Sequence, residues 1–213
     1  MTIFSICNIK GGSGKSTTAI HLAAYLHAKG TKTAVIDCDG QQTISAWIEL
    51  VDSLEGVTIF KSTDTDEIED AIAELESTHE AIVVDVAGSS EELMKIVLSL
   101  SDFVLVPLAP SPLDVTSTVA TIKQIVRARR RTARKINATV LLNKVVKNTT
   151  LAKETRQLFL EYEGVEFSPV EIPQAQRLMK LASKKQTAFD SKSSRDLAQL
   201  YTELFNQFVG VKS

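Results

Sequence analysis

The sequence lacks the features of several large protein classes. No apolar stretch approaches the roughly 20 residues of a membrane-spanning helix, and the N-terminus lacks the basic, apolar and small-residue regions of a signal peptide. Two cysteines in 213 residues, without a metal-binding or redox spacing, exclude a disulfide-stapled miniprotein. We therefore expect a reduced, cytoplasmic setting and a single domain over residues 1–213.

The net charge is close to zero, but charged residues of the two signs are unevenly distributed along the chain. The formal net charge is −2, from 24 Lys and Arg against 26 Asp and Glu. Residues 49–92 carry 14 acids and one base, whereas residues 115–153 carry ten bases and no acid. The near-neutral total hides this asymmetry, so it does not exclude a polyanionic ligand.

Apolar runs rich in Val, Ile and Leu alternate with helical patterns. Several runs are continuous rather than alternating, which is typical of parallel strands buried on both faces. The pattern predicts an α/β fold, a doubly wound and mostly parallel sheet of about seven strands with helices on both faces. We expect strands over 3–8, 33–37, 57–60, 81–86, 103–108, 138–143 and near 169–172, and helices over 15–29, 41–53, 64–77, 90–99, 112–131, 149–162, 174–184 and 194–209.

A glycine-rich segment, IKGGSGKST at residues 9–17, follows the first predicted strand and precedes the first predicted helix. Glycines let such a loop aim N–H groups at phosphate oxygens, and the helix start adds a positive dipole end. We expect Lys15 to reach the β- and γ-phosphates and the Ser16 hydroxyl to bind Mg²⁺. The predicted phosphate-binding residues are Gly11, Gly12, Ser13, Gly14, Lys15, Ser16 and Thr17.

This segment departs from the ordinary pattern G-x-x-x-x-G-K-[ST], because its first position is Ile9 and it has a second lysine, Lys10. The run KGGSGKST resembles the deviant Walker A motif of the ParA/MinD family of ATPases. The resemblance implies a P-loop NTPase fold, ATP and Mg²⁺ as cofactors, and a homodimer on ATP binding. In the family the lysine that matches Lys10 reaches the partner's nucleotide, so ATP binding and dimerisation are linked.

Acidic side chains follow two predicted strands. The run Asp37-Cys38-Asp39-Gly40-Gln41 resembles the family's D-x-D-P-Q switch segment, with Gly40 in place of proline. Asp39 matches the acid that orients or activates the attacking water, and Asp37 an acid near the Mg²⁺ shell; both could instead be strand-end turn residues. Asp85 ends an apolar run in the Walker B form and would hold Mg²⁺ directly or through water. The predicted catalytic residues are Lys10, Lys15 and Asp39, and the predicted metal-binding residues are Ser16, Asp37 and Asp85.

Two later segments resemble the family's base site. Asn143 ends a predicted strand and matches the asparagine that reads adenine, since its amide could pair with the base edge; a simple turn residue is the alternative. The run Ile172-Pro173-Gln174 resembles the segment that lies against the adenine, which makes Pro173 a candidate cofactor-binding residue.

Bases gather in two groups in the second half of the chain. Such density without balancing acids indicates a polyanion, and the family binds DNA without sequence preference through basic residues in its C-terminal half. The alternative is solvated helix faces with favourable dipole charges. We expect these bases on DNA-facing surfaces of the dimer, with the acidic segment turned away. The candidates are Arg127, Arg129, Arg130, Arg131 and Arg134 in the first group, and Lys180, Lys184 and Lys185 in the second.

The motifs together predict a small, nucleoid-associated ParA-type ATPase that positions plasmid or other cargo. A ParB-like centromere-binding protein or another cargo adaptor would stimulate its weak hydrolysis of ATP. Three alternatives stay open: a VirC-type conjugation ATPase, whose branch the run Gly88-Ser89-Ser90-Glu91 resembles, a MinD-like membrane-recruited regulator, and a DNA scaffold with negligible hydrolysis. We expect the last helix to pack in the core rather than on a membrane, because it lacks a basic rim.

Overall fold

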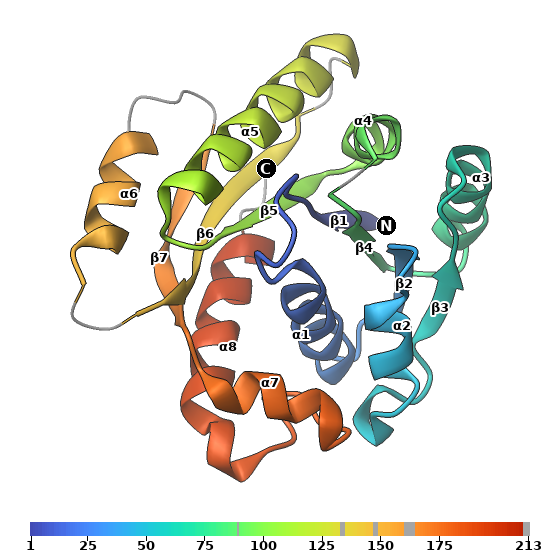
Figure 1. Cartoon of the computed structure of the whole chain (residues 1–213). Helices are drawn as coiled ribbons and strands as arrows, with labels where there is room; N and C mark the ends of the chain where they lie inside the picture. Colours follow the sequence, from blue (N-terminus) through green and yellow to red (C-terminus); the bar gives the residue numbers. More distant parts are fainter. Residues whose placement is uncertain (89, 133–134, 147–148, 160–164, 211–213) are drawn as a thin grey trace.

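The structure is a computed structural model of the chain, and it describes residues 1–88, 90–132, 135–146, 149–159 and 165–210. Seven strands form one sheet in the order β3-β2-β4-β1-β5-β6-β7 (Figure 1). Every neighbouring pair is parallel, which confirms the predicted doubly wound sheet and extends "mostly parallel" to all six pairs. The strands are β1 Thr2–Ile6, β2 Thr33–Cys38, β3 Thr58–Lys61, β4 Ala81–Val86, β5 Phe103–Leu108, β6 Asn137–Val145 and β7 Glu166–Pro173.

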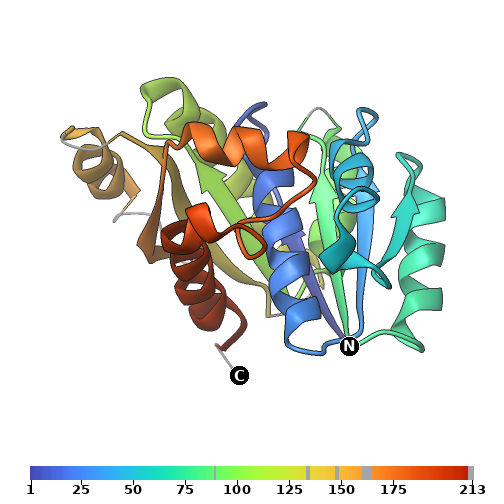
Figure 2. The same cartoon turned by 90° about the horizontal axis from the view of Figure 1, so that it is seen from below.

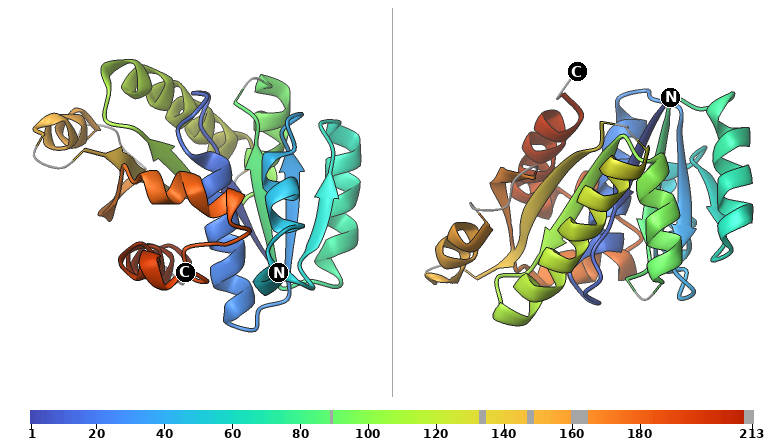
Figure 3. Two further views of the ribbon diagram at one scale, coloured as in Figure 1. Left: turned by 60° about the horizontal axis from the view of Figure 1, so that its bottom comes forward. Right: turned by 90° about the horizontal axis from the view of Figure 1, so that it is seen from above.

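Helices cover both faces of this sheet. The two views in Figure 3 show α7 and α8 in front of one face and α4 and α5 in front of the other. The described helices are α1 Lys15–Ala28, α2 Thr43–Ile48, α3 Thr65–Glu76, α4 Glu91–Leu100, α5 Pro112–Thr132, α6 Leu151–Phe159, α7 Gln176–Ser183 and α8 Arg195–Gly210, with short 3₁₀ turns at Asp52–Leu54 and Lys192–Ser194.

The helix expected over residues 41–53 is shorter in the structure. Its first residues form a turn in which the Gln41 and Gln42 amides donate to the Asp39 side chain and carbonyl, at 2.9 and 2.8 Å. Gln42 then takes a left-handed φ of 48° before α2 begins. The loop that follows Asp39 therefore replaces the first turn of the expected helix.

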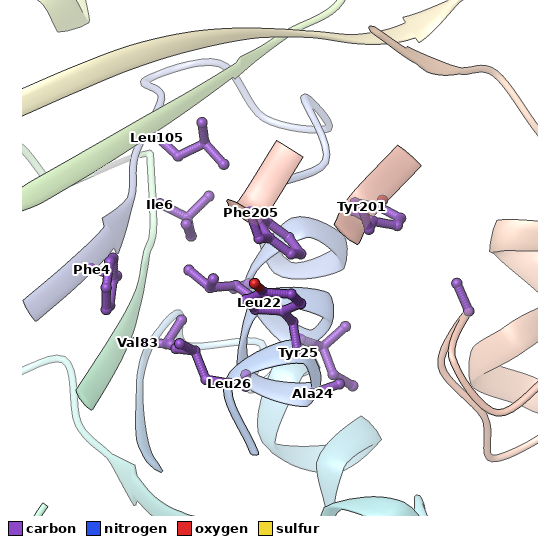
Figure 4. Close-up of a cluster of buried hydrophobic side chains, with 14 of the residues drawn as sticks. Phe4, Ile6, Leu22, Ala24, Tyr25, Leu26, Val83, Leu105, Tyr201 and Phe205 are labelled. Carbon is purple, nitrogen blue, oxygen red and sulfur yellow. The ribbon is translucent and has the colours of Figure 1, made fainter. Parts of the chain in front are cut away.

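Two apolar layers hold the helices on the sheet. Phe4 and Ile6 of β1 face α1 and α8, whereas Ile3 and Cys7 face the layer under α3, α4, α5 and α6. Figure 4 shows Tyr201 and Phe205 of α8 among the side chains of the first layer. The apolar side of α8 is buried as expected, at Leu197, Tyr201, Leu204, Phe205 and Phe208.

The topology brings the predicted site residues to one edge of the sheet. The strand order reverses at β1, which lies between β4 and β5. In open α/β sheets the crevice outside the carboxyl ends of the strands at such a point is the usual ligand site. The loops after β1, β2, β4 and β6 carry the predicted motifs and all leave the sheet at this edge.

Candidate functional site

A cavity of about 630 Å³ opens at the carboxyl edge of the sheet, between the loop after β1 and the start of α7. In Figure 2, α7 lies in front of the start of α1 on this side of the molecule. Residues from five stretches of the chain line the cavity: Ile9, Gly11, Gly12, Gly14, Lys15, Ser16, Thr17, Asp39, Thr43, Ala87, Gly88, Asn143, Lys144, Pro173, Gln174, Ala175, Leu178 and Met179.

The glycines of the loop are required by its shape. Gly14 precedes α1 with φ 98°, and Gly12 has φ 73°, a backbone conformation that L side chains rarely adopt. A Cβ atom on Gly14 would lie 2.1 Å from the Asn143 amide nitrogen. The loop main chain therefore packs directly against the end of β6, which a side chain at position 14 would prevent.

The ammonium of Lys15 lies inside the loop. Its side chain is nearly buried, and its ammonium donates to the Lys10 carbonyl at 3.1 Å. Burial lowers the pKa of Lys15, while the nearby Asp85 carboxyl raises it. A buried ammonium at the N-terminus of a helix is suited to bind an anion, because both the charge and the helix dipole favour one.

Asp85 ends β4 as a buried carboxyl with both oxygens lacking a hydrogen-bond partner in the described part of the chain. Burial raises its pKa to about 7; the Ser16 hydroxyl and the Lys15 ammonium lower it, and Asp37 and Asp39 raise it. Such an orphaned carboxyl costs free energy unless a cation or proton compensates it. Next to the Ser16 hydroxyl and the phosphate loop, it fits a Mg²⁺ ion.

The two oxygen ligands, from Ser16 and Asp85, suit Mg²⁺ better than a metal ion that is coordinated only by protein side chains. Among the described residues, no group of three or more His, Cys, Asp or Glu side chains gathers closely enough to hold a metal ion. Mg²⁺ is usually held by one or two protein oxygens together with substrate phosphates and waters. Ser16 and Asp85 are therefore sufficient as protein ligands.

The two acids at the end of β2, Asp37 in the strand and Asp39 just after it, have different surroundings. Asp37 is buried, and its carboxylate accepts from the Asp39 amide at 3.1 Å and the Ser45 amide at 3.0 Å. It lies opposite Asp85 in the β2–β4 register. Asp39 lies in the cavity wall and accepts from the Gln41 amide at 2.9 Å. The geometry thus leaves Asp39 facing the cavity, whereas Asp37 fixes the loop that carries it.

The side of the cavity predicted to hold the base is formed by the ends of β6 and β7 and by α7. The Asn143 amide donates to the Ser13 carbonyl at 2.8 Å, and its oxygen accepts from the Lys144 amide at 2.9 Å. Asn143 therefore supports the phosphate loop, in addition to any contact with a base. Pro173 lies in the same cavity wall, where the sequence places it.

A model of the CobQ/CobB/MinD/ParA nucleotide binding domain family matches residues 4–188 of the chain. The chain belongs to this family. The match spans most of the sequence, and it covers every predicted nucleotide-site residue. Members of the family are ATPases.

Two named relatives share similar sequence. A ParA from Rhizobium radiobacter is 28% identical over 145 residues, which are 68% of this chain and 65% of that protein. A maintenance of carboxysome distribution protein A from Halothiobacillus neapolitanus is 29% identical over 164 residues, which are 76% of this chain and 74% of that protein. The match with the ParA thus spans slightly under two thirds of that protein's length.

Solved structures share the fold at lower identity. A Cyanothece McdA in complex with ATP superposes with a TM-score of 0.79 at 15% identity, covering 100% of this chain and 98% of that one. A putative plasmid partition protein from Borrelia burgdorferi bound to AMPPNP gives a TM-score of 0.72 at 21% identity, covering 97% and 98%. A cobyrinic acid a,c-diamide synthase from Mycobacterium smegmatis, solved with ADP and magnesium, has a TM-score of 0.68.

Several residues that line the cavity are not among the site residues predicted from the sequence. Lys144 follows Asn143 directly, so its neighbour is the signal that could have pointed to it. Gly88 packs the loop after β4 against the loop after β1, since a Cβ there would lie 2.4 Å from the Ile9 carbonyl oxygen. Leu178 and Met179 reach the cavity from α7, and nothing in the local sequence marks them.

Lys10, in contrast, is absent from the residues that line the cavity of its own chain. Its amide donates to the Asn8 side chain at 3.0 Å, and its carbonyl accepts from Lys15. The backbone of Lys10 thus belongs to the phosphate loop. The role predicted for its ammonium does not follow from the single chain.

The two basic groups lie on opposite faces of the sheet. The first ends α5, on the face shared with α4, whereas the second lies in and just after the C-terminal part of α7, on the face shared with α1 and α8. The groups do not form one surface, so a DNA contact cannot rest on their sum. The acidic helix α3 lies beside β3, at the far edge of the sheet from β6 and β7.

The members of the first basic group also differ among themselves. Arg129 is half-buried, and its Nε donates to the Ile136 carbonyl at 2.8 Å, so it joins α5 to the chain that enters β6. Arg127 and Arg131 line a cavity of about 340 Å³ together with the acid Glu91. Arg130 is exposed, and Arg134 lies outside the described residues.

Proposed function

We propose that this chain is a ParA-type, Mg²⁺-dependent ATPase. On ATP it dimerises, binds DNA without sequence preference and positions plasmid or other cargo, and a partner protein stimulates hydrolysis. The observation that carries the ATPase proposal is the unpartnered carboxyl of Asp85, buried beside Ser16 and a phosphate loop that contains Lys15. ATP or its analogues occupy the structures of two proteins with the same fold.

The chemistry follows from the positions of a few side chains. Lys15 and the loop N–H groups stabilise negative charge on the transferring phosphoryl group. Ser16 and Asp85 would hold Mg²⁺, which neutralises charge on the β- and γ-phosphate oxygens when bound. Asp39 faces the cavity from the switch loop, where it orients the attacking water.

Two side chains near the nucleotide cavity, Lys10 and Met179, support dimerisation. Among the described residues that line the cavity Lys10 does not appear, which is consistent with an ammonium that contacts a second copy. Met179 lies at the cavity mouth with 81% of its surface exposed. A large apolar side chain in that position is well placed to be covered when a partner closes over the nucleotide.

DNA binding is supported mainly by the second basic group. Lys180, Lys184 and Lys185 are all exposed, and they follow the part of α7 whose Leu178 and Met179 line the cavity. Nucleotide binding can therefore affect the position of these lysines. In this proposal the dimer is nucleoid-associated, because contacts with phosphates require no particular sequence.

The test compares wild type with a Lys15→Gln variant. We expect wild type to bind ATP with Mg²⁺, to dimerise and to co-sediment with DNA of unrelated sequences, and this binding to weaken steeply with salt. Lys15→Gln should lose all three properties, whereas Lys153→Gln, an exposed lysine on α6, should keep them. Unchanged ATP-dependent DNA binding in Lys15→Gln would contradict the proposal.

A conjugation ATPase is the second candidate. The observation that favours it is the similarity to a virC1 protein from Rhizobium radiobacter, 28% identical over 134 residues, or 59% of this chain. The bound partner distinguishes the two, and an Asp39→Ala variant that retains ATP is the bait for a pull-down. A centromere-binding protein or other cargo adaptor supports cargo positioning, and a relaxase-associated protein supports conjugation.

A MinD-like membrane role is less well supported. Among the described residues, no helix is both long and apolar enough to cross a bilayer. The apolar side of α8 is buried against the sheet, so that this face is not available to a lipid surface. ATP-dependent binding to liposomes would overturn this assignment.

A further inference from the structure

Lys144 contacts the phosphate loop from the neighbouring strand β6. It follows Asn143 near the end of β6, and its ammonium donates to the Gly12 carbonyl at 2.5 Å. Its side chain lines the cavity together with Gly12 and Pro173. Neither the Walker motifs nor the predicted base site includes this residue.

The backbone of Lys144 is strained in a way that serves this contact. Its φ is 56°, in the left-handed region that costs residues other than glycine, asparagine and aspartate about 1 kcal/mol or more. The Asn143 side chain holds this conformation by accepting from the Lys144 amide at 2.9 Å. Strain of this kind persists where surrounding contacts enforce it, and it is common at ligand sites.

Asn143 and Lys144 together satisfy two successive carbonyls of the loop. Asn143 donates to the Ser13 carbonyl at 2.8 Å, and Lys144 donates to the Gly12 carbonyl. A loop that aims its N–H groups at an anion turns carbonyl groups outward, and those groups need donors of their own. The pair supplies these donors from the C-terminal part of β6.

We propose that Lys144 is a positioning residue that holds the phosphate loop in its anion-binding shape and thereby sets the affinity for nucleoside di- and triphosphates. This inference rests on the proposed function, because it assumes that the cavity binds nucleotide. Lys144 acts through the loop, so ADP and ATP lose affinity by similar factors when its ammonium is removed.

Asparagine is the informative substitution, because it tolerates the left-handed backbone but carries no cation. We expect Lys144→Asn to bind ADP and ATP about tenfold more weakly, in line with the loss of one charged hydrogen bond. Lys144→Arg should restore most of the affinity, and Lys153→Asn, an exposed lysine of α6, should leave it unchanged. The measurements are nucleotide titrations, kcat and KM, and the free energy of unfolding.

Hydrogen exchange of residues 9–17 without nucleotide gives a second readout that does not depend on binding. We expect faster exchange in Lys144→Asn than in wild type, with an unfolding free energy that does not fall. Wild-type affinity in the Asn variant, or a lower kcat with unchanged KM, would overturn the inference. If wild type binds no nucleotide, the proposed function fails. Unchanged exchange in Lys144→Asn would then overturn the remaining statement about loop shape.

Discussion

At the scale of single residues, the phosphate loop depends on glycine where its backbone meets β6. Gly14 combines a φ of 98° with the approach to the Asn143 amide. At Gly40, in the switch loop, a Cβ would meet open space. These two glycines therefore form a matched pair for testing how closely the loop must pack.

We expect Gly14→Ala to bind ATP at least tenfold more weakly and to lose about 1–3 kcal/mol of unfolding free energy, because the new Cβ must displace Asn143 in a strained backbone. Gly40→Ala should change the unfolding free energy by no more than about 0.5 kcal/mol. Isothermal titration and urea unfolding measure both quantities. Wild-type ATP affinity in Gly14→Ala would show that the loop does not need this packing.

His21 gives the fold a dependence on pH. It is buried on α1, stacks on Tyr201 with ring centroids 4.3 Å apart, and accepts from the Ala188 amide at 3.0 Å. Its other nitrogen then donates to the Thr17 carbonyl at 2.6 Å. Burial lowers the pKa of His21 to about 4, although the Thr17 carbonyl and Asp190 raise it.

The unfolded chain therefore binds more protons than the folded chain between the ordinary pKa of 6.5 and about 4. The contribution of His21 is complete above pH 6.5 and is lost as the pH falls, by up to about 1.4 kcal/mol per unit. The unfolding free energy of wild type minus that of His21→Gln should fall by about 1–3 kcal/mol between pH 7 and 4.5. The difference removes the contributions of the other titrating groups, which the two proteins share. A difference that does not change with pH would contradict this role of His21.

At the scale of elements, α5 and α7 place their basic residues in different surroundings. The end of α5 uses Arg129 to hold the Ile136 carbonyl and mixes Arg127 and Arg131 with Glu91. Lys180, Lys184 and Lys185, in and just after the C-terminal part of α7, are all exposed. These differences predict unequal roles for two groups that look equivalent in the sequence.

We expect a triple change of Lys180, Lys184 and Lys185 to Gln to weaken ATP-dependent DNA binding strongly and to reduce the salt slope by up to about 0.9 for each lost phosphate contact. The same change at Arg127, Arg130 and Arg131 leaves Arg129 intact and serves as the charge-matched comparison. It should weaken binding less. A larger loss in the α5 triple would assign the DNA surface to the other face of the sheet.

At the scale of the whole molecule, the sequence was sufficient for the fold and for much of the cavity. Continuous apolar strands such as Ala81–Val86 are unambiguous, and the loops that follow parallel strands must meet at one edge. Lys15, Ser16, Asp39, Asn143 and Pro173 accordingly all line the cavity, and their roles toward a nucleotide stay predictions.

Contacts between elements that are far apart in the sequence could not be predicted. Met179 reaches the cavity because α7 crosses its mouth, and no local pattern specifies that crossing. Lys144 contacts Gly12 because β6 ends beside the loop, 132 residues apart in sequence. The opposite placement of the two basic groups likewise follows from which face each helix covers, which the count of charges does not contain.

We expect that Lys10 of a second chain completes the nucleotide site of the first. Sedimentation velocity of an Asp39→Ala variant, with Mg²⁺ and either ATP or ADP, tests this claim most directly because hydrolysis is slowed. We expect the Asp39→Ala variant to be a dimer with ATP and a monomer with ADP. The double variant with Lys10→Ala should be a monomer with ATP. A monomer with ATP at saturation, or a dimer that forms equally in all three conditions, would contradict this claim.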